Sequence, residues 1–323
     1  MSDILVSVCV ITYNHCNYIR QCLDGILMQQ TSYPFEIIIN DDSSTDGTTE
    51  IIKDYVTKYP DIIRPIFHEE NQYSKGVRGM FANFCFPKAR GKYIALCEGD
   101  DYWTDPLKLQ KQVDFLESNA QYSMACSDAI IQTTSGELNW SRYSANMDIP
   151  VEDIIINGGL FVQTASYIFR RNLLDNYPNF CKQCHVGDYP LIIFAALKGN
   201  VRWFAEKQVV YRFSMDNSWT ATNTKSDIVK LINGWRSEVN MLGGMDKYSN
   251  HKYQNTFYRR QADYLYSILK GNQNFLKEIY QEFQDVKNKF SLHQKLGVFL
   301  MKYNFYTPIS NIVYRLRHIN DSL

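Results

Sequence analysis

The sequence predicts an α/β protein with a mostly parallel sheet and flanking helices, followed by a helical C-terminal region. Apolar strand patterns alternate with helical patterns of about 10–15 residues through the first two thirds of the chain. From about residue 225 the pattern changes to successive helices rich in Tyr, Lys and Gln. We therefore predict one domain over 1–220 and a helical region over 221–323, a candidate for membrane association or oligomerisation.

The individual elements follow from apolar periodicity. Residues 4–11 are almost wholly apolar, as expected for a strand covered on both faces. The strands predicted in the same way are 35–39, 62–67, 93–97, 122–131, 165–169, 201–204 and 207–213. Helices are predicted near 19–27, after the turn at 44–47, over 76–89, from Asp105-Pro106 onward, and near 187–198. The stretch 132–160 is rich in loops.

The composition limits the class of protein. The 323 residues are 45% hydrophobic, which is enough for a sizeable core. Lys+Arg and Asp+Glu both count 34, and this zero net charge argues against a nucleic-acid partner. The first residues lack the basic region of a secretory signal, and no run reaches the ~18 apolar residues of a membrane span. We expect a cytoplasmic protein.

Cysteine usage agrees with that expectation. Several of the eight cysteines fall on predicted buried strands, as reduced thiols do. Residues 181–185 (CKQCH) have the spacing of a c-type haem attachment site. Haem attachment would require export, and a zinc site would need a second pair of ligands. We interpret these cysteines as incidental thiols in a loop.

Two predicted strands end in acidic turns, and these are the most informative features of the chain. The strand 93–97 runs into Glu98-Gly99-Asp100-Asp101, and the strand 35–39 runs into residues 40–47 (NDDSSTDG). Carboxylates at the rim of a sheet suit a divalent cation that bridges a diphosphate. Asp42 could accept a hydrogen bond from a uracil imide or a ribose hydroxyl. The alternative for Asp42 is helix capping, but Asp46 lies closer to the helix start.

Three segments together resemble a known family. Residues 8–14 (VCVITYN), 40–48 (NDDSSTDGT) and 89–101 (ARGKYIALCEGDD) are similar, in order and spacing, to the inverting family 2 glycosyltransferases of the GT-A fold. The resemblance covers roughly residues 4–220. It implies that Tyr13 and Asp42 hold the base of a nucleotide-sugar, in a pocket lined by Ile11 and Thr12.

The resemblance also implies a metal site. Asp101 would ligate Mn²⁺ or Mg²⁺, and Asp100 would contact the ribose or the donor sugar. Arg78 is the basic residue expected near the nucleotide phosphates, with Lys75 as a second candidate and an ordinary solvated cation as the alternative. Many relatives carry a His two residues after the position of Arg212, where this chain has Ser214.

The expected catalytic base is Asp188. It follows Gly187 and precedes an apolar helical run, as the base of the family does. It would take the proton from the acceptor hydroxyl while the diphosphate leaves on the opposite face. Capping of the helix is the alternative. Trp103 could be a platform for the donor or acceptor sugar, or a core residue, and Trp219 could belong to a lid over the nucleotide.

These expectations define a function and its rivals. We expect an enzyme that moves a sugar from a nucleotide-sugar to a hydroxyl of a glycan or lipid-linked acceptor, with inversion, in a bacterial surface polysaccharide pathway such as capsule or lipopolysaccharide synthesis. UDP is expected from the habit of the family. The rival is a non-catalytic nucleotide-sugar-binding scaffold of the same fold. A nucleotidyltransferase would carry a Gly-rich basic loop near its start, and none is present.

The C-terminal segment is basic and amphipathic. From residue 286 onward it holds six Lys/Arg and one acidic residue. Leu296, Phe299, Leu300 and Tyr303 share one helical face, and a second apolar face follows over 309–316. A basic amphipathic surface of this kind suits peripheral contact with an anionic inner membrane. The alternative is a helix packed on the main domain or on a second copy of the chain in a homo-oligomer.

Overall fold

The computed structural model describes residues 4–138, 140–159, 161–213, 228–271, 286 and 288–302. The chain divides into two compact units, Met1–Ile228 and Val229–Leu323. The first holds the sheet and the predicted site residues. The second is helical and is described separately below.

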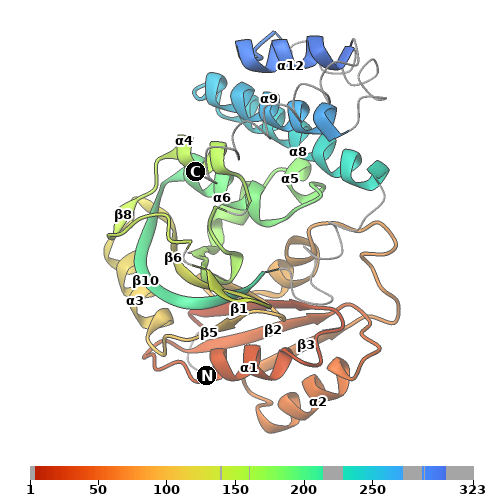
Figure 1. Ribbon diagram of the computed structural model, residues 1–323. Coiled ribbons are helices and arrows are strands. Elements are labelled where there is room, and N and C mark those ends of the chain that lie inside the picture. Colours follow the sequence, from red (N-terminus) through yellow and green to blue (C-terminus); the bar gives the residue numbers. More distant parts are fainter. Residues whose placement is uncertain are drawn as a thin grey trace, which may run out of the picture. The chain divides into compact units, whose positions relative to one another are not determined.

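The first unit is built on a ten-stranded sheet (Figure 1). The strand order is β3-β2-β1-β4-β9-β6-β10-β5, with β7 beside β6 and β8 beside β10. The strands are β1 (Val6–Thr12), β2 (Phe35–Asp41), β3 (Ile63–Phe67), β4 (Tyr93–Glu98), β5 (Tyr102–Trp103), β6 (Tyr122–Thr133), β7 (Gly136–Leu138), β8 (Met147–Asp148), β9 (Ile168–Arg170) and β10 (Asn200–Arg212).

The sheet is mixed. Strands β3, β2, β1 and β4 are parallel, as are β6 and β10, whereas short β9 runs antiparallel between β4 and β6. The long β10 curves along one side of the sheet (Figure 1). The predicted α/β fold is therefore confirmed. The carboxyl ends of β1, β2 and β4 meet at one edge of the sheet, and the acidic turns follow β2 and β4.

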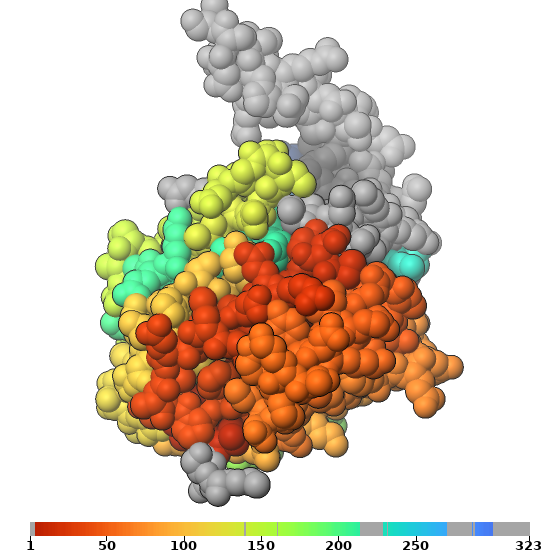
Figure 2. Space-filling model, turned by 90° about the horizontal axis from the view of Figure 1, so that it is seen from below, coloured from red at the N-terminus to blue at the C-terminus, as the bar shows by residue number. Residues whose placement is uncertain are grey.

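Helices flank this sheet. They are α1 (Ile19–Leu27), α2 (Thr48–Lys58), α3 (Lys108–Ser118), α4 (Val151–Asn157), α5 (Asn179–Lys182) and α6 (Asp188–Lys198). In Figure 1, α1 and α2 lie on one side of β1, β2 and β3, and α6 lies on the other. Seen from below, the elements from β1 to β4 form most of the visible face of this unit (Figure 2).

Three expectations about local structure are corrected. The helix predicted over 76–89 is reduced to a π-helical turn, Phe81–Cys85, and a 3₁₀ turn, Phe86–Lys88, because Gly76 and Gly79 adopt positive φ values of 93° and 60°. Helix α3 starts later than Asp105-Pro106, at Lys108. The two strands predicted within 201–213 are one strand, β10, with irregular register near 204–209.

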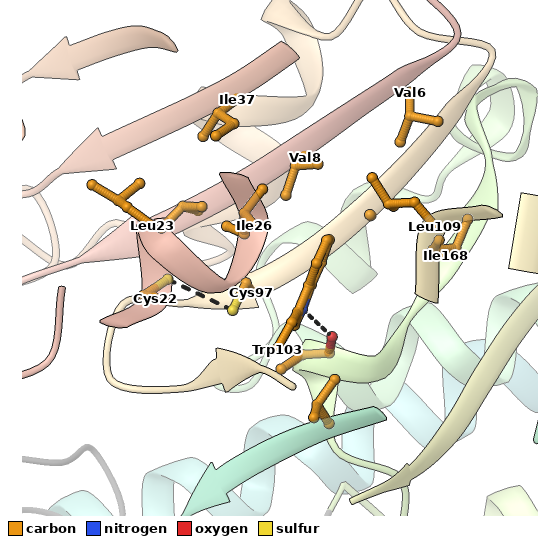
Figure 3. Close-up of a cluster of buried hydrophobic side chains, with 14 of the residues drawn as sticks. Val6, Val8, Cys22, Leu23, Ile26, Ile37, Cys97, Trp103, Leu109 and Ile168 are labelled. Carbon is orange, nitrogen blue, oxygen red and sulfur yellow. Dashed lines mark hydrogen bonds between the residues drawn. The ribbon is translucent and has the colours of Figure 1, made fainter. Parts of the chain in front are cut away.

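The main core lies between α1, α3 and the sheet. Figure 3 shows Leu23 and Ile26 of α1 facing Val8 of β1, beside the indole of Trp103. The thiol sulfurs of Cys22 and Cys97 are 3.7 Å apart, and all eight cysteines are free. Each side chain buried here adds about 1.5–3 kcal/mol of hydrophobic stabilisation.

The second unit contains α8 (Ile228–Tyr248), α9 (Gln254–Gly271) and α12 (Leu292–Lys302). Its core is formed by Ile232, Val239, Ala262, Leu265, Ile268, Leu269, Val286, Phe290 and Val298. The predicted helical C-terminal region is therefore confirmed. Among the described helices, none combines the length and the apolar character that a membrane crossing requires.

Candidate active site

The loops after β1 and β2 are tied to each other at the carboxyl edge of the sheet. The N–H of Asn14 donates to Ser44 Oγ (2.9 Å), and Asn14 Oδ1 accepts from the N–H of Thr45 (2.8 Å). The N–H of His15 donates to Thr48 Oγ1 (2.8 Å). Asn14 has a φ of 56°, a conformation that costs energy for a residue other than glycine. The two loops thus form one cross-linked surface.

Asp42 anchors a third loop to this surface. Its Oδ1 accepts from the N–H of Gln72 (2.7 Å) and its Oδ2 from the N–H of Tyr73 (3.0 Å). The N–H of Asp42 donates to the carbonyl of Thr12 (3.0 Å). The guanidinium of Arg78 lies 4.2 Å from the ring centre of Tyr73 and donates to its carbonyl (3.0 Å). Asp42, Tyr73 and Arg78 therefore belong to one connected set of contacts.

The other aspartates of this region have structural partners too. Asp46 Oδ1 accepts from the N–H of Thr48 (3.0 Å), the first residue of α2, while Gly47 takes the N-cap position with a φ of 99°. Asp41 Oδ1 accepts from the N–H of Ser44 (3.1 Å). The spacing of these residues in the sequence did not reveal that both Asp41 and Asp42 hold turns in place.

At the end of β1, Tyr13 is the exposed aromatic residue. Its exposed fraction is 44%, whereas Thr12 is 4% exposed and Ile11 is partly buried. The Thr12 hydroxyl lies 3.1 Å from His15 Nδ1. A tyrosine ring in this position offers an open face on which a planar base could stack.

Gly99 brings the acidic turn of β4 against β1, and this close approach yields a prediction. A Cβ on Gly99 would lie 2.6 Å from Thr12 Oγ1 and 2.7 Å from Thr12 Cβ. Because Thr12 is β-branched and buried, it cannot rotate away cheaply. We expect Gly99→Ala to lower the free energy of unfolding by about 1–3 kcal/mol in urea titrations.

The matched control is Gly187→Ala. A Cβ on Gly187 would meet no atom within 4 Å, and its φ is −100°. Its stability should stay close to that of the unaltered chain. Equal stability of the two variants would contradict the packing argument.

Asp101 is the most buried carboxylate of the acidic turn. It is 1% exposed, and its Oδ1 accepts from the N–H of Arg212 (2.9 Å). Its Oδ2 is buried without a hydrogen-bond partner in the part of the chain that the structure describes. Burial, and then the charges of Asp100 and Glu98, raise the pKa of Asp101 well above its usual value. An unpaired buried oxygen of this kind is costly in the absence of a cation.

This oxygen fits a divalent cation, since Mg²⁺ and Mn²⁺ prefer carboxylate oxygens. No group of three or more His, Cys, Asp or Glu residues with metal-binding geometry occurs among the described residues. Ligands from the described residues alone would thus leave the coordination sphere incomplete. Such open sites are usual where substrate phosphates and water complete the shell.

Asp188 is the first residue of α6, and burial raises its pKa to about 6. Glu98, at the end of β4, has a pKa raised to about 8 by burial, then by the charges of Asp100 and Asp188. The charges of Asp100 and Asp188 thus both act on Glu98, which links the start of α6 electrostatically to the acidic turn. A Cβ on Gly159 would lie only 3.3 Å from Asp188 Oδ2, so Gly159 leaves room beside this carboxylate.

The structure adds two residues that the sequence argument missed. Glu98 links Asp100 and Asp188 electrostatically, and Arg212 binds the turn that carries Asp101. The signal for Glu98 is an acidic residue at the end of an otherwise apolar strand. Arg212 has no comparable signal, because its role depends on the pairing of β10 with β5.

The structure gives Trp103 the second of its two expected roles, in the core. It is 1% exposed, its Nε1–H donates to the carbonyl of Ala165 (2.8 Å; Figure 3), and Lys108 Nζ lies 4.2 Å from the indole. A buried ring cannot stack on a sugar, so we do not carry the platform role forward. Ser214 and Trp219 lie outside the described residues.

Arg78 also lines a cavity of about 450 Å³. The other lining residues are Gly76, Val77, Asn83, Asn179, Lys182 and Gln183. Lys182 and Gln183 place this cavity next to the segment that leads into α6. In that segment, burial and the charge of Arg78 lower the pKa of His185. Cys181 and Cys184, from the CKQCH segment, are buried.

A comparison with protein-family models assigns the chain to a family. The family model for glycosyl transferase family 2 matches residues 7–178, more than half of the chain. The chain belongs to glycosyltransferase family 2. An uncharacterized protein of Mycobacterium tuberculosis is 36% identical over 228 residues, which cover 68% of this chain and 62% of that protein. The chain thus matches less than two thirds of the length of these relatives.

Other similarities are local in sequence or limited to the fold. Over 114 residues (35% of this chain, 42% of the relative), the chain is 39% identical to the UDP-Glc:alpha-D-GlcNAc-diphosphoundecaprenol beta-1,3-glucosyltransferase WfaP of Escherichia coli. Among solved structures, S. aureus TarS 1-349 in complex with UDP-GlcNAc has a TM-score of 0.64 at 16% identity, covering 94% of this chain and 89% of TarS. This family 2 chain therefore has the GT-A fold that was expected.

A second solved structure is the mannosyltransferase PcManGT from Pyrobaculum calidifontis in complex with GDP-Man and Mn²⁺. It has a TM-score of 0.52 at 16% identity and covers 95% of this chain and 86% of that protein. At this identity the likeness concerns the fold alone.

Proposed function

We propose that this protein is an inverting glycosyltransferase. It transfers a sugar from a nucleotide-sugar, with UDP-sugars as the first choice, to a hydroxyl of a glycan or lipid-linked oligosaccharide in bacterial surface polysaccharide synthesis. The observation that supports the proposal is an electrostatic link between two distant segments. Glu98, beside Asp100 and Asp101, is electrostatically close to Asp188 at the start of α6. A cation ligand and a general base would thus serve one reaction.

The donor nucleotide would lie at the carboxyl edge of β1, β2 and β4. The exposed ring of Tyr13 would stack on the base, and Ile11 and Thr12 would line its pocket. Asp42 would act mainly by holding the loop of Gln72 and Tyr73, since both of its oxygens already accept hydrogen bonds there. A uracil imide could share one of these oxygens, because each has a second lone pair.

The diphosphate would be held by a cation and by Arg78. Asp101 would bind Mn²⁺ or Mg²⁺ through Oδ2, and Asp100 would contact the ribose or the donor sugar. When bound, the cation would neutralise charge on the leaving diphosphate. Arg78 is fixed by its stacking on Tyr73, so little side-chain entropy would be lost on binding phosphate.

Asp188 would be the general base. Its carboxylate would take the proton of the acceptor hydroxyl as that oxygen bonds to the anomeric carbon, and the bond from that carbon to the diphosphate breaks on the opposite face. The anomeric configuration would therefore invert. A pKa of about 6 keeps Asp188 ionised at neutral pH and makes it a stronger base than an ordinary aspartate.

A screen of nucleotide-sugars tests the proposal. The full chain would be incubated with UDP-, GDP- and dTDP-sugars, Mn²⁺ and lipid-linked or free oligosaccharides, with release of nucleoside diphosphate and product mass as readouts. We expect metal-dependent turnover of one UDP-sugar. Saturable nucleotide binding without hydrolysis or transfer of any donor would instead favour the non-catalytic scaffold.

The pH dependence supplies a second prediction. Because Asp188 must be deprotonated and its pKa is raised to about 6, its active form is lost as the pH falls through that value. We expect kcat/KM to fall about tenfold per pH unit below pH 6. A profile that stays flat down to pH 4.5, with the chain still folded by circular dichroism, would argue against Asp188 as the base.

We also propose that the C-terminal region contacts an anionic membrane surface. Leu292, Leu296 and Phe299 of α12 are 85%, 56% and 55% exposed, and they share one helical face. Tyr303 and the second apolar face at 309–316 lie outside the described residues. Leu296→Asp should weaken co-sedimentation with phosphatidylglycerol vesicles, relative to the charge-conserving control Lys295→Arg at an exposed position of the same helix. Equal sedimentation of both variants would count against membrane contact.

A further inference from the structure

Arg212, the last residue of β10, makes an unusual set of contacts with the acidic turn. It is 6% exposed, and its N–H donates to Asp101 Oδ1 (2.9 Å). Its guanidinium donates through Nη1 to the carbonyl of Asp100 and through Nη2 to Gln21 Oε1. Backbone and side chain of one residue thus bind two successive aspartates and α1.

Two aromatic rings fix the plane of this guanidinium. Its central carbon lies 4.8 Å from the ring centre of Tyr18 and 4.5 Å from that of Tyr102. Tyr18 precedes α1 and Tyr102 directly follows Asp101. A planar fork with several donors can stack and donate at once, which a lysine ammonium cannot. Arg212 therefore locks the turn on both sides of Asp101.

These contacts decide which oxygen of Asp101 is available. The N–H of Arg212 occupies Oδ1, and Oδ2 stays buried without a partner among the described residues. The bond to the Asp100 carbonyl restrains the backbone next to it. A carboxylate held in one orientation binds a cation without paying for the loss of rotamer freedom.

We propose that Arg212 is a positioning residue that presents Asp101 Oδ2 to the divalent cation. The proposal rests on the cation site of the proposed function. It assigns Arg212 no contact with substrate or cation, because the guanidinium N–H groups donate to the Asp100 carbonyl and to Gln21 Oε1. A residue with this role should set the affinity for the cation, beyond any contribution to folding.

The test is the Mn²⁺ affinity of the full chain, measured by calorimetry with and without UDP, for Arg212→Met and Arg212→Lys. We expect both variants to bind Mn²⁺ about 10–100-fold more weakly. The matched control is Arg202→Met on the same strand, whose guanidinium lies 5.2 Å from the ring of Phe115 and pairs with Asp148 (3.1 Å). Its Mn²⁺ affinity should be that of the unaltered chain.

The outcomes are distinct. Unchanged Mn²⁺ affinity in folded Arg212→Met, with the unaltered chain binding Mn²⁺, would overturn the positioning role and leave the proposed function intact. Failure of the unaltered chain to bind Mn²⁺ at all would overturn the cation site and this role together. If Arg212→Met does not fold, the Mn²⁺ affinity of Gln21→Ala replaces it as the test. Gln21 is exposed, and its Oε1 accepts a hydrogen bond from the Arg212 guanidinium. A severalfold weaker Mn²⁺ affinity supports the role, and an unchanged one overturns it.

Discussion

Asp188→Asn is expected to lower the rate of sugar transfer by a factor of about 10²–10⁴, with little change in the affinity for UDP. The substitution keeps the shape of the side chain and its place at the start of α6. It removes the ability to accept a proton. The loss should therefore appear in kcat, whereas binding of the donor nucleotide at the other end of the site should persist.

The measurement combines initial rates of transfer with calorimetric titration of UDP. Asp175→Asn, an exposed aspartate of the same unit, is the matched control and should retain full activity. An unchanged rate of sugar transfer in Asp188→Asn would contradict the role of Asp188 as the general base. Loss of UDP binding together with activity would point to a structural role instead.

Asp101→Asn should abolish Mn²⁺-dependent binding of UDP and reduce transfer by a factor of about 10³ or more. The amide oxygen can still accept the N–H of Arg212, as Oδ1 does now. The amide nitrogen would then take the place of Oδ2 and direct N–H groups toward the cation. This variant replaces a ligand by a donor without emptying the space.

Although Asp101→Asn should lose activity, its thermal stability should not decrease. The pKa of Asp101 is raised in the folded state, so the ionised carboxylate destabilises the fold at pH values above its usual pKa. We expect Asp101→Asn to be at least as resistant to thermal unfolding as the unaltered chain at pH 7 without metal. A lower melting temperature, relative to the exposed control Asp54→Asn, would contradict the inference that the ionised Asp101 carboxylate destabilises the fold.

The sequence allowed much of the fold to be predicted, because long apolar strands leave a strong local signal. Strands β1, β2 and β4 and helix α6 follow from periodicity alone. The helix predicted over 76–89 is wrong. The apolar spacing of this segment fits a helix, but Gly76 and Gly79 adopt positive φ values that a helix excludes. Apolar periodicity thus predicted an element correctly where the backbone conformation of its residues was compatible with that element.

Candidate site residues could be named from the sequence where residue type and position match the family motifs, and their roles stay predictions. Asp101 and Asp188 stand at a strand end and a helix start, and the resemblance to the family gives them their predicted roles. Trp103 was ambiguous, since an indole two residues after Asp101 could equally face a ligand or the core. The roles of Glu98 and Arg212 depend on contacts between distant segments, which no local pattern encodes.

The cross-linking of the loops after β1 and β2 has a consequence for kinetics. Asn14 joins them through Ser44 and Thr45, so hydrogen bonds hold the loop that carries Tyr13 without any nucleotide present. Binding to a surface that is already ordered costs little chain entropy and requires no slow rearrangement. Under the proposed function, association of the nucleotide base with Tyr13 should therefore proceed in a single rapid phase.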